Sequence, residues 1–307
     1  MGKKGLISVI IPLYGDFDQS KLEFSVESIK RQKGANLEII VAEQTTIQRL
    51  KKITDITYLH HPIELSRDGY FIPGKVRNCA AKMAKGEFIY NTDSDVIFFN
   101  DRYFEEVILR LKENQNLCLS QPPMRRLPIE NFKEFRERFE EKGLQYALST
   151  LDISQPYGAT YNTLPIRIRH FIKQKDDKIE ILVATQKDHN TYLDGNNKGK
   201  EPCYYSLDVH AGGIIMRKSQ FVTIGGYSER YSGWGCHDDD IQWKLGCTFT
   251  LETIPKETKY EVLHIDHNRN YFSHKRWMLN EAIKKSRQQK GIASAIDYDM
   301  KRYYENK

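Results

Sequence analysis

The sequence predicts a fold of the α/β class, in which helices cover both faces of a doubly wound, mixed and mostly parallel sheet. Two observations support this prediction. Short apolar runs of strand length alternate with segments of helical spacing through the first third of the chain. The chain has 307 residues, of which 39% are hydrophobic, and this is enough for a sizeable core. Sheets of this kind bind ligands at the carboxyl ends of their strands.

The expected strands are apolar runs rich in β-branched residues, and their ranges are 7–13, 37–42, 56–59 and 87–91. Two intervening segments, 20–33 and 73–85, carry apolar residues at helical spacing, and the second is stopped by Gly86. Strands that alternate with helices favour a parallel sheet, because each helix must return the chain to the same edge.

The pattern loosens over 124–202, where a charged helical stretch is followed by polar, turn-rich sequence. We expect this segment to be an insertion on the acceptor side or a lid within one catalytic domain, 1–273. The remaining residues, 274–307, form a basic helical appendage broken at Gly291. Two interpretations of this tail stay open: a helix on a membrane surface, or a helix packed on the domain with a solvated basic face.

The composition excludes several classes of protein. With 29% charged residues and an ordinary apolar content, the chain is not disordered. No apolar run approaches the ~18 residues of a membrane helix, and the short apolar start is a buried strand rather than a signal peptide, so we expect a cytoplasmic protein. Five scattered cysteines without a CxxC pair indicate neither a zinc site nor disulfides. The net charge of +6 suits a polyanionic partner, but no nucleic-acid motif accompanies it.

Two carboxylates, Asp93 and Asp95, directly follow the strand expected at 87–91. If the chain turns there, both can reach one divalent cation, and hard oxygen ligands suit Mn²⁺ or Mg²⁺, which in turn hold a diphosphate. The alternative is a solvated, aspartate-rich turn.

The segment 225–240 carries the most chemical information. Trp234 lies between two glycines, which let the backbone approach a ligand, and an exposed indole is a surface on which sugars stack. Three consecutive aspartates, 238–240, then open an amphipathic segment. One of them beside an acceptor hydroxyl is a candidate general base, whereas the plainer interpretation is a capped helix with a buried tryptophan.

His264 and His267 follow this cluster, three residues apart. In a turn, the two imidazoles can share one ion and complete a mixed carboxylate–histidine site for Mn²⁺. The alternative is a pair of histidines whose hydrogen bonds are satisfied within the fold.

In this order, these residues resemble the animal β-1,4-galactosyltransferases and their bacterial relatives, including the chondroitin-polymerase-type enzymes. The resemblance covers about half the chain in scattered blocks and is densest over 211–269. Its blocks are 211–216, 221–227 and 233–241, with thinner matches of the broad family-2 glycosyltransferase type at 8–12, 41–44, 75–78 and 93–95. The resemblance implies a GT-A fold, which is a Rossmann-like, doubly wound mixed sheet. It also implies an inverting, metal-dependent glycosyltransferase that moves a hexose or N-acetylhexosamine from a UDP-sugar to a glycan hydroxyl.

The resemblance also implies roles for individual residues. Asp95 and His267 are expected to bind Mn²⁺ (or Mg²⁺), with His264 as a further ligand and Asp93 on the donor or in the shell of the ion. Asp238 is expected to be the catalytic base. The other residues expected at the site are Pro12, Gln44, Arg77 and Asn78 near the nucleotide, Gly212 and Gly213 along the donor sugar, and Trp234, His237 and Asp239 at the acceptor.

The chain departs from the family pattern just before the base, where Cys236 and His237 replace a glycine and a glutamate. Because that glutamate helps to bind sugar, His237 is expected either to contact an acidic acceptor or to face solvent. Rival functions are a nucleotidyltransferase, which would need a Gly-rich phosphate loop that 10–15 does not provide, a non-catalytic carbohydrate-binding protein, and a transferase acting on a peptide side chain. The tail leaves peripheral membrane association as a further expectation.

Overall fold

The computed structural model describes residues 2–15, 17–62, 69–127, 131–149, 169–175, 178–184, 203–204, 209–255, 257–265, 267 and 273–305. Much of the segment 124–202 lies outside these ranges, so its interpretation as an insertion or lid stays a prediction. Its described part includes an antiparallel hairpin of β8 (Arg169–Lys175) and β9 (Lys178–Ala184), and β10 (Cys203–Tyr204) pairs with β8.

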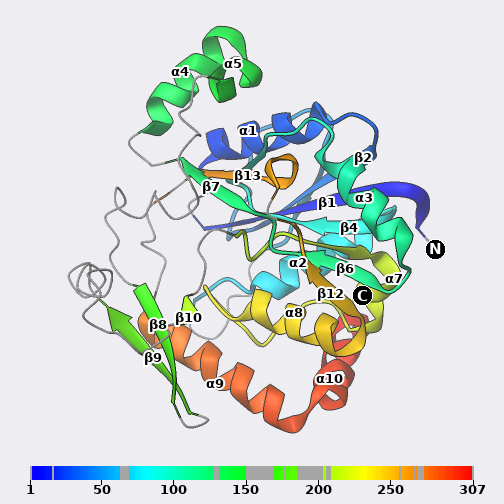
Figure 1. Ribbon diagram of the computed structural model, residues 1–307, viewed down its shortest axis with the longest axis vertical. Coiled ribbons are helices and arrows are strands. Elements are labelled where there is room, and N and C mark those ends of the chain that lie inside the picture. Colours follow the sequence, from blue (N-terminus) through cyan, green and yellow to red (C-terminus); the bar gives the residue numbers. More distant parts are fainter. Residues whose placement is uncertain are drawn as a thin grey trace.

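A seven-stranded mixed sheet forms the centre of the molecule (Figure 1). Its strands, in spatial order, are β12 (Thr250–Thr253), β6 (Leu117–Ser120), β11 (Ile214–Arg217), β4 (Gly86–Asn91), β1 (Lys3–Tyr14), β2 (Asn36–Gln44) and β3 (Thr57–His60). All of them run parallel except β11, which is antiparallel to both of its neighbours. The predicted mixed sheet is therefore confirmed, as is the strand expected at 56–59.

Helices cover both faces of this sheet. One face carries α1 (Gln19–Lys30) and α3 (Tyr103–Glu113), and the other carries α2 (Pro73–Met83), α7 (Lys218–Thr223) and α8 (His237–Thr248). Successive side chains of β1 point to opposite faces, so Val9 joins the core under α1 and Ile10 the core under α2. This alternation explains why β1 reads as a continuous apolar run.

A second, three-stranded sheet consists of β5 (Val96–Phe98), β13 (Val262–Ile265) and β7 (Met124–Leu127), with β13 in the middle. β13 is antiparallel to β5 and places His264 opposite Val96. The backbone N–H of Ile265 donates to the carbonyl of Asp95 at 2.8 Å. This pairing brings a strand that is distant in sequence to the residues that follow β4.

The charged stretch expected to be helical at the start of 124–202 forms two helices, α4 (Phe132–Lys142) and α5 (Leu144–Ser149). Gly143 ends α4 with a φ of 80°, which a glycine adopts without steric cost. The aromatic side chains of α4 pack edge-on against Phe24 of α1 and so fix α4 to the main domain.

Two helices complete the chain: α9 (His274–Lys290) and α10 (Ile292–Glu305), separated at Gly291 as expected. Arg287 of α9 binds Asp240 of α8 and Asp299 of α10, and Lys244 of α8 lies 2.7 Å from Asp299. All four charged side chains are buried. The expectation of a solvated basic tail is therefore wrong for Arg287, which neutralises two carboxylates inside the protein.

None of the described helices is long and apolar enough to cross a membrane. Four cysteines, Cys79, Cys118, Cys236 and Cys247, are free thiols.

Candidate active site

The carboxyl ends of β1, β2 and β4 meet at one edge of the main sheet. The register pairs Tyr14 with Gln44 and Ile10 with Asn91, so the residues after β4 emerge beside the ends of β1 and β2. Gln44 Nε2 and both amide atoms of Asn91 are buried without a hydrogen-bond partner among the described residues. Because buried polar atoms are normally paired, this edge has the chemistry of a polar ligand site.

Asp93 lies between the side chains of Arg77 and His210 at this edge. Arg77 of α2 donates from Nη2 to Asp93 Oδ1 at 3.0 Å, and His210 Nε2 lies 3.0 Å from Asp93 Oδ2. Burial by itself raises the pKa of Asp93, but the hydrogen bond and charge of His210 and the charge of Arg77 outweigh it and hold the pKa below its ordinary value. The side chain is still 39% exposed, so Asp93 is an ionised group that a ligand can reach.

Arg77 itself is buried and surrounded by aromatic rings. It donates from Nη1 to the hydroxyl of Tyr14 at 2.6 Å and lies 5.2 Å from the ring centroid of Tyr227. Burial lowers the pKa of Arg77, but Tyr14 and Tyr227, and after them Asp238 and Asp93, raise it overall. The guanidinium is therefore a fixed positive charge at the site.

The structure brings Asp95, His264 and His267 together, as predicted. Asp95 Oδ2 lies 3.6 Å from His264 Nε2 and 3.1 Å from His267 Nε2, and one ligand atom from each residue fits within a span of 4.8 Å. Burial raises the pKa of Asp95, but the two histidines outweigh this effect and lower it. Asp95 Oδ1 is buried and has no hydrogen-bond partner among the described residues. One carboxylate and two imidazoles form a donor set that fits Mn²⁺.

The two glycines expected along the donor sugar, Gly212 and Gly213, lie in the turn before β11. A Cβ on Gly212 would lie 3.1 Å from Asp93 Oδ2, and one on Gly213 would lie 2.6 Å from the ring of Pro122. Gly212 therefore keeps the space around Asp93 open, whereas Gly213 allows the backbone to pack against Pro122.

His210 is a member of the site that the sequence analysis missed. It is 4% exposed and comes directly before this turn, so that its imidazole reaches Asp93. Its position before the glycine pair was the only signal in the sequence, and an isolated histidine in a loop does not reveal which carboxylate it will contact.

Trp234 lies in a turn that leads into α8 and is partly buried. Gly233, Gly235 and Cys236 have φ values of 65°, 103° and 67°. The left-handed conformation is inexpensive for the glycines and unusual for a cysteine. This sharp turn leaves His237 as the first residue of α8.

The base candidate, Asp238, lies in the first turn of α8. Its Oδ2 is 3.2 Å from His237 Nε2, whereas Oδ1 is buried and has no hydrogen-bond partner among the described residues. The charge of Asp238 acts on Arg77 and on Tyr14, so the carboxylate lies near the donor-side residues. His237 is 8% exposed and does not face solvent, which contradicts one of the two expectations for it.

The next two aspartates contact α9. Asp239 Oδ2 accepts a hydrogen bond from Lys284 Nζ at 3.0 Å, and its side chain is 36% exposed. Asp240 is fully buried between Arg287 and the hydroxyl of Tyr231. Asp240 is therefore structural, and the acceptor role of Asp239 stays a prediction.

The remaining predicted residues differ in what they offer a nucleotide. Pro12 is buried within β1, and Gln44 Oε1 accepts from the backbone of Ile72 at 2.8 Å while Nε2 stays available. Both amide atoms of Asn78 bind the backbone of Tyr227, which fixes α2 to the turn after α7. Asn78 thus links α2 to Tyr227, and its expected place near the nucleotide stays a prediction.

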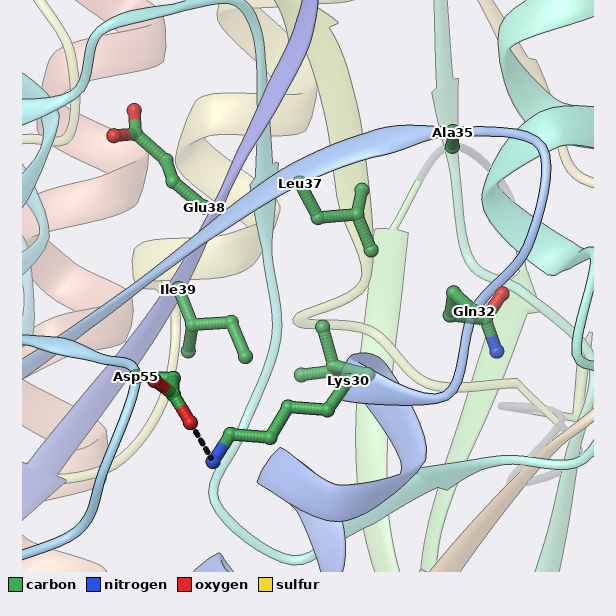
Figure 2. A pocket seen from close by; sticks show the side chains of 8 residues that line it. Lys30, Gln32, Ala35, Leu37, Glu38, Ile39 and Asp55 are labelled. Atoms are coloured by element: carbon green, nitrogen blue, oxygen red, sulfur yellow. Dashed lines mark hydrogen bonds and ion pairs between the residues drawn. The ribbon is translucent and has the colours of Figure 1, made fainter.

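A hollow in the described structure lies elsewhere. It has a volume of about 260 Å³ and is lined by the end of α1 and the first half of β2, with Lys30 and Asp55 joined at its rim (Figure 2). Its walls, including Leu37 and Ile39, belong to the amino-terminal half of β2, away from Gln44. It is therefore separate from the carboxyl edge.

Fold and site together define an α/β enzyme of the glycosyltransferase class, with its polar site at the carboxyl edge of a mixed sheet. The chain belongs to glycosyl transferase family 2, whose model matches residues 8–171. A second model, described as the N-terminal domain of galactosyltransferase, matches residues 200–268. The two matches confirm the predicted resemblance and the GT-A fold class.

Similar proteins share only part of their length with this chain. An uncharacterized glycosyltransferase of Rickettsia conorii is 29% identical over 117 residues, which is 37% of this chain and 18% of that protein. Another, of Rickettsia bellii, is 27% identical over 124 residues, or 40% of this chain and 17% of that protein. The matched region thus spans less than a fifth of the length of these relatives.

Among solved structures, S. aureus TarS 1–349 in complex with UDP is similar, with a TM-score of 0.46 and 14% identity over 85% of this chain and 60% of that chain. The same protein in complex with UDP-GlcNAc gives a TM-score of 0.46 and 13% identity, over 85% of this chain and 59% of that chain.

Proposed function

We propose that this protein is an inverting, metal-dependent glycosyltransferase that moves a hexose or N-acetylhexosamine from a UDP-sugar to a hydroxyl of a glycan acceptor. Synthesis of a bacterial-type polysaccharide or glycoconjugate is the corresponding process. The observation that carries the proposal is the arrangement of charges at one edge of the sheet. Asp95 with two histidines offers a cation site, and Arg77 and Asp93 lie beside it. Asp238 lies near enough to Arg77 to act on its charge, and its Oδ1 has no hydrogen-bond partner among the described residues.

The donor side would hold a UDP-sugar diphosphate through charge. Asp95, His264 and His267 would hold the divalent cation, Mn²⁺ or Mg²⁺, and the two imidazoles favour Mn²⁺. When bound, such an ion supplies positive charge to a departing diphosphate. Arg77 adds a fixed positive charge nearby, and Asp93, held by Arg77 and His210, is placed to accept hydrogen bonds from sugar hydroxyls.

The acceptor side would supply the base. Asp238 takes the proton of the acceptor hydroxyl while the acceptor oxygen forms a bond to C1 of the donor sugar, and the bond from C1 to the diphosphate oxygen breaks. Because His237 engages Oδ2, the proton is received at Oδ1. One in-line displacement releases UDP and inverts the anomeric centre. Trp234, and Asp239 at 36% exposure, would line the acceptor.

The domain assignment and location complete the proposal. Residues 1–273 form the catalytic domain, and 274–307 form a helical extension whose exposed face carries Met278, Leu279 and basic residues such as Lys285. This face suits an anionic membrane surface at the cytoplasmic side. Sedimentation with vesicles of phosphatidylglycerol and phosphatidylcholine tests it, and failure to co-sediment at low salt rejects it.

The test of the reaction is UDP release from UDP-Gal, UDP-GalNAc, UDP-Glc and UDP-GlcNAc, each with Mn²⁺ or with EDTA. Slow hydrolysis of one donor that is lost with EDTA supports the proposal and identifies the sugar. Absence of both hydrolysis and Mn²⁺-dependent UDP binding would refute it. Addition of candidate glycans or peptides then separates a glycan acceptor from a peptide side chain.

A further inference from the structure

The turn that carries Trp234 is held by one buried side chain, Asn280 of α9, and by the backbone N–H of Gly233, which donates to the carbonyl of Phe71 at 2.7 Å. Asn280 Nδ2 donates to the carbonyls of Ser232, Trp234 and Gly235 at 3.0, 3.2 and 3.3 Å. Its Oδ1 accepts from the backbone N–H of Ser232 at 3.5 Å, which is a weak bond. The side chain is 0% exposed. The two N–H groups of one amide are therefore shared among three carbonyls of a turn that lies outside regular secondary structure.

The glycines of this turn allow it to lie directly on α9. A Cβ on Gly233 would lie 3.1 Å from the Arg276 side chain, and a Cβ on Gly235 would lie 2.8 Å from Trp277 Cδ1. Any larger residue would push the turn away from the helix. Contact with α9 thus helps to set the position of the turn, together with the bond from Gly233 to Phe71.

The same face of α9 continues along the first turn of α8. Asn280, Lys284 and Arg287 are separated by four and three residues and therefore share one side of the helix. In order along α9 they bind the Trp234 turn, Asp239 and Asp240. Asp238 lies along the chain between the Trp234 turn and Asp239, both of which α9 binds. No recorded contact joins Asp238 itself to α9.

This arrangement matters because the turn includes a strained residue. Cys236, at the N-cap of α8, has a φ of 67°, which a non-glycine residue keeps only where its surroundings hold it there. Relaxation of Cys236 would rotate the first turn of α8 and move Asp238 relative to the donor-side charges. Asn280 binds the carbonyl of Gly235, directly before Cys236, and so opposes this movement.

We propose that Asn280 is a positioning residue that holds the Trp234 turn and, through it, Asp238 in the geometry for attack on the donor. This inference rests on the proposed function. Asn280 touches no reacting atom, and its effect is confined to the acceptor side, because the recorded contacts of Asp93 and Asp95 come from α2, β13 and the loops that contain His210 and His267.

The test substitutes Asn280→Asp, which keeps the shape of the side chain but replaces the donating amide by a carboxylate facing three carbonyls. Asn280→Ser is the second variant, which shortens the side chain without adding charge. The matched control is Gln289→Glu, the same amide-to-acid change on the exposed side of α9. Each variant is assayed for Mn²⁺-dependent UDP binding by calorimetry and for hydrolysis of the accepted UDP-sugar, with water in place of the acceptor.

We expect kcat for hydrolysis, per UDP-binding site, to fall about 10- to 100-fold in both Asn280 variants, the effect of a displacement of about 1 Å. The UDP stoichiometry, the Kd for UDP and the KM for the donor should stay within about twofold of the unsubstituted protein. Gln289→Glu should match the unsubstituted protein throughout.

Two results overturn the positioning role alone: an unchanged kcat in Asn280→Asp, or a loss of UDP stoichiometry in step with activity in both Asn280 variants, which indicates a merely structural residue. Absence of both donor hydrolysis and Mn²⁺-dependent UDP binding in the unsubstituted protein instead overturns the proposed function, and with it this inference.

Discussion

Replacement of Asp238 by asparagine tests the proposed base most directly. The substitution keeps the volume of the side chain, and Oδ1, which has no hydrogen-bond partner among the described residues, becomes unable to take a proton. His237 Nε2 can still donate to the remaining side-chain oxygen, so the start of α8 should be preserved. The chemical step therefore loses general base catalysis while the fold is retained.

General base catalysis is worth about 10²–10⁴-fold in rate. At 1.36 kcal/mol per tenfold, this corresponds to a barrier higher by about 2.7–5.4 kcal/mol. We expect Asp238→Asn to lower kcat for UDP release by that factor, measured as phosphate released from UDP by a coupled nucleotidase. UDP affinity in the presence of Mn²⁺ should change less than about threefold, because neither Asp95 nor its two histidines is altered.

The matched control for this substitution is Asp297→Asn, the same change at an exposed position of α10 whose recorded ion pair is with Lys301. It should leave both kcat and UDP affinity unchanged. If Asp238→Asn kept more than about a tenth of the activity of the unsubstituted protein, Asp238 would not be the base.

Three further predictions concern the cation site, the glycine turn and the ionic network. His267→Ala should weaken binding of Mn²⁺ alone, followed by calorimetry, because it removes one of the clustered ligand atoms; unchanged Mn²⁺ affinity would exclude His267 as a ligand. Gly213→Ala should lower the free energy of unfolding by about 1–3 kcal/mol in urea, since the new Cβ would lie 2.6 Å from a proline ring. Gly246→Ala, in α8 with the nearest atom 3.9 Å away, should instead be stabilising by about 0.5–1 kcal/mol, and equal effects of the two changes would contradict the packing argument. Arg287→Met should cost about 3–5 kcal/mol because two buried carboxylates lose their partner, whereas exposed Lys290→Met should be nearly neutral; a loss below about 1 kcal/mol in Arg287→Met would show that the network is not needed for stability.

Much of the sheet and its helices could be predicted because their signals are local. The apolar run around Val9 marks a strand buried on both faces, and the helical spacing through 73–85 marks α2. The aspartates after β4 lie at a strand end for the same reason, and a parallel sheet brings its carboxyl ends to one edge. The sequence alone therefore places these aspartates at the carboxyl edge of the sheet.

The sequence by itself determined the strand and helix pattern, the family, and the residues from which a cation site and a base can be built. Only the tertiary structure decided which of them meet. The pairing of β13 with β5 sets His264 opposite Val96 and so beside Asp95, and no local pattern specifies which strands pair. The tertiary structure also divided the three adjacent aspartates, leaving Asp238 at the site and turning Asp240 towards Arg287. Spacing along a chain limits which side chains can be neighbours on one element, but contacts between distant elements depend on packing that involves the whole chain.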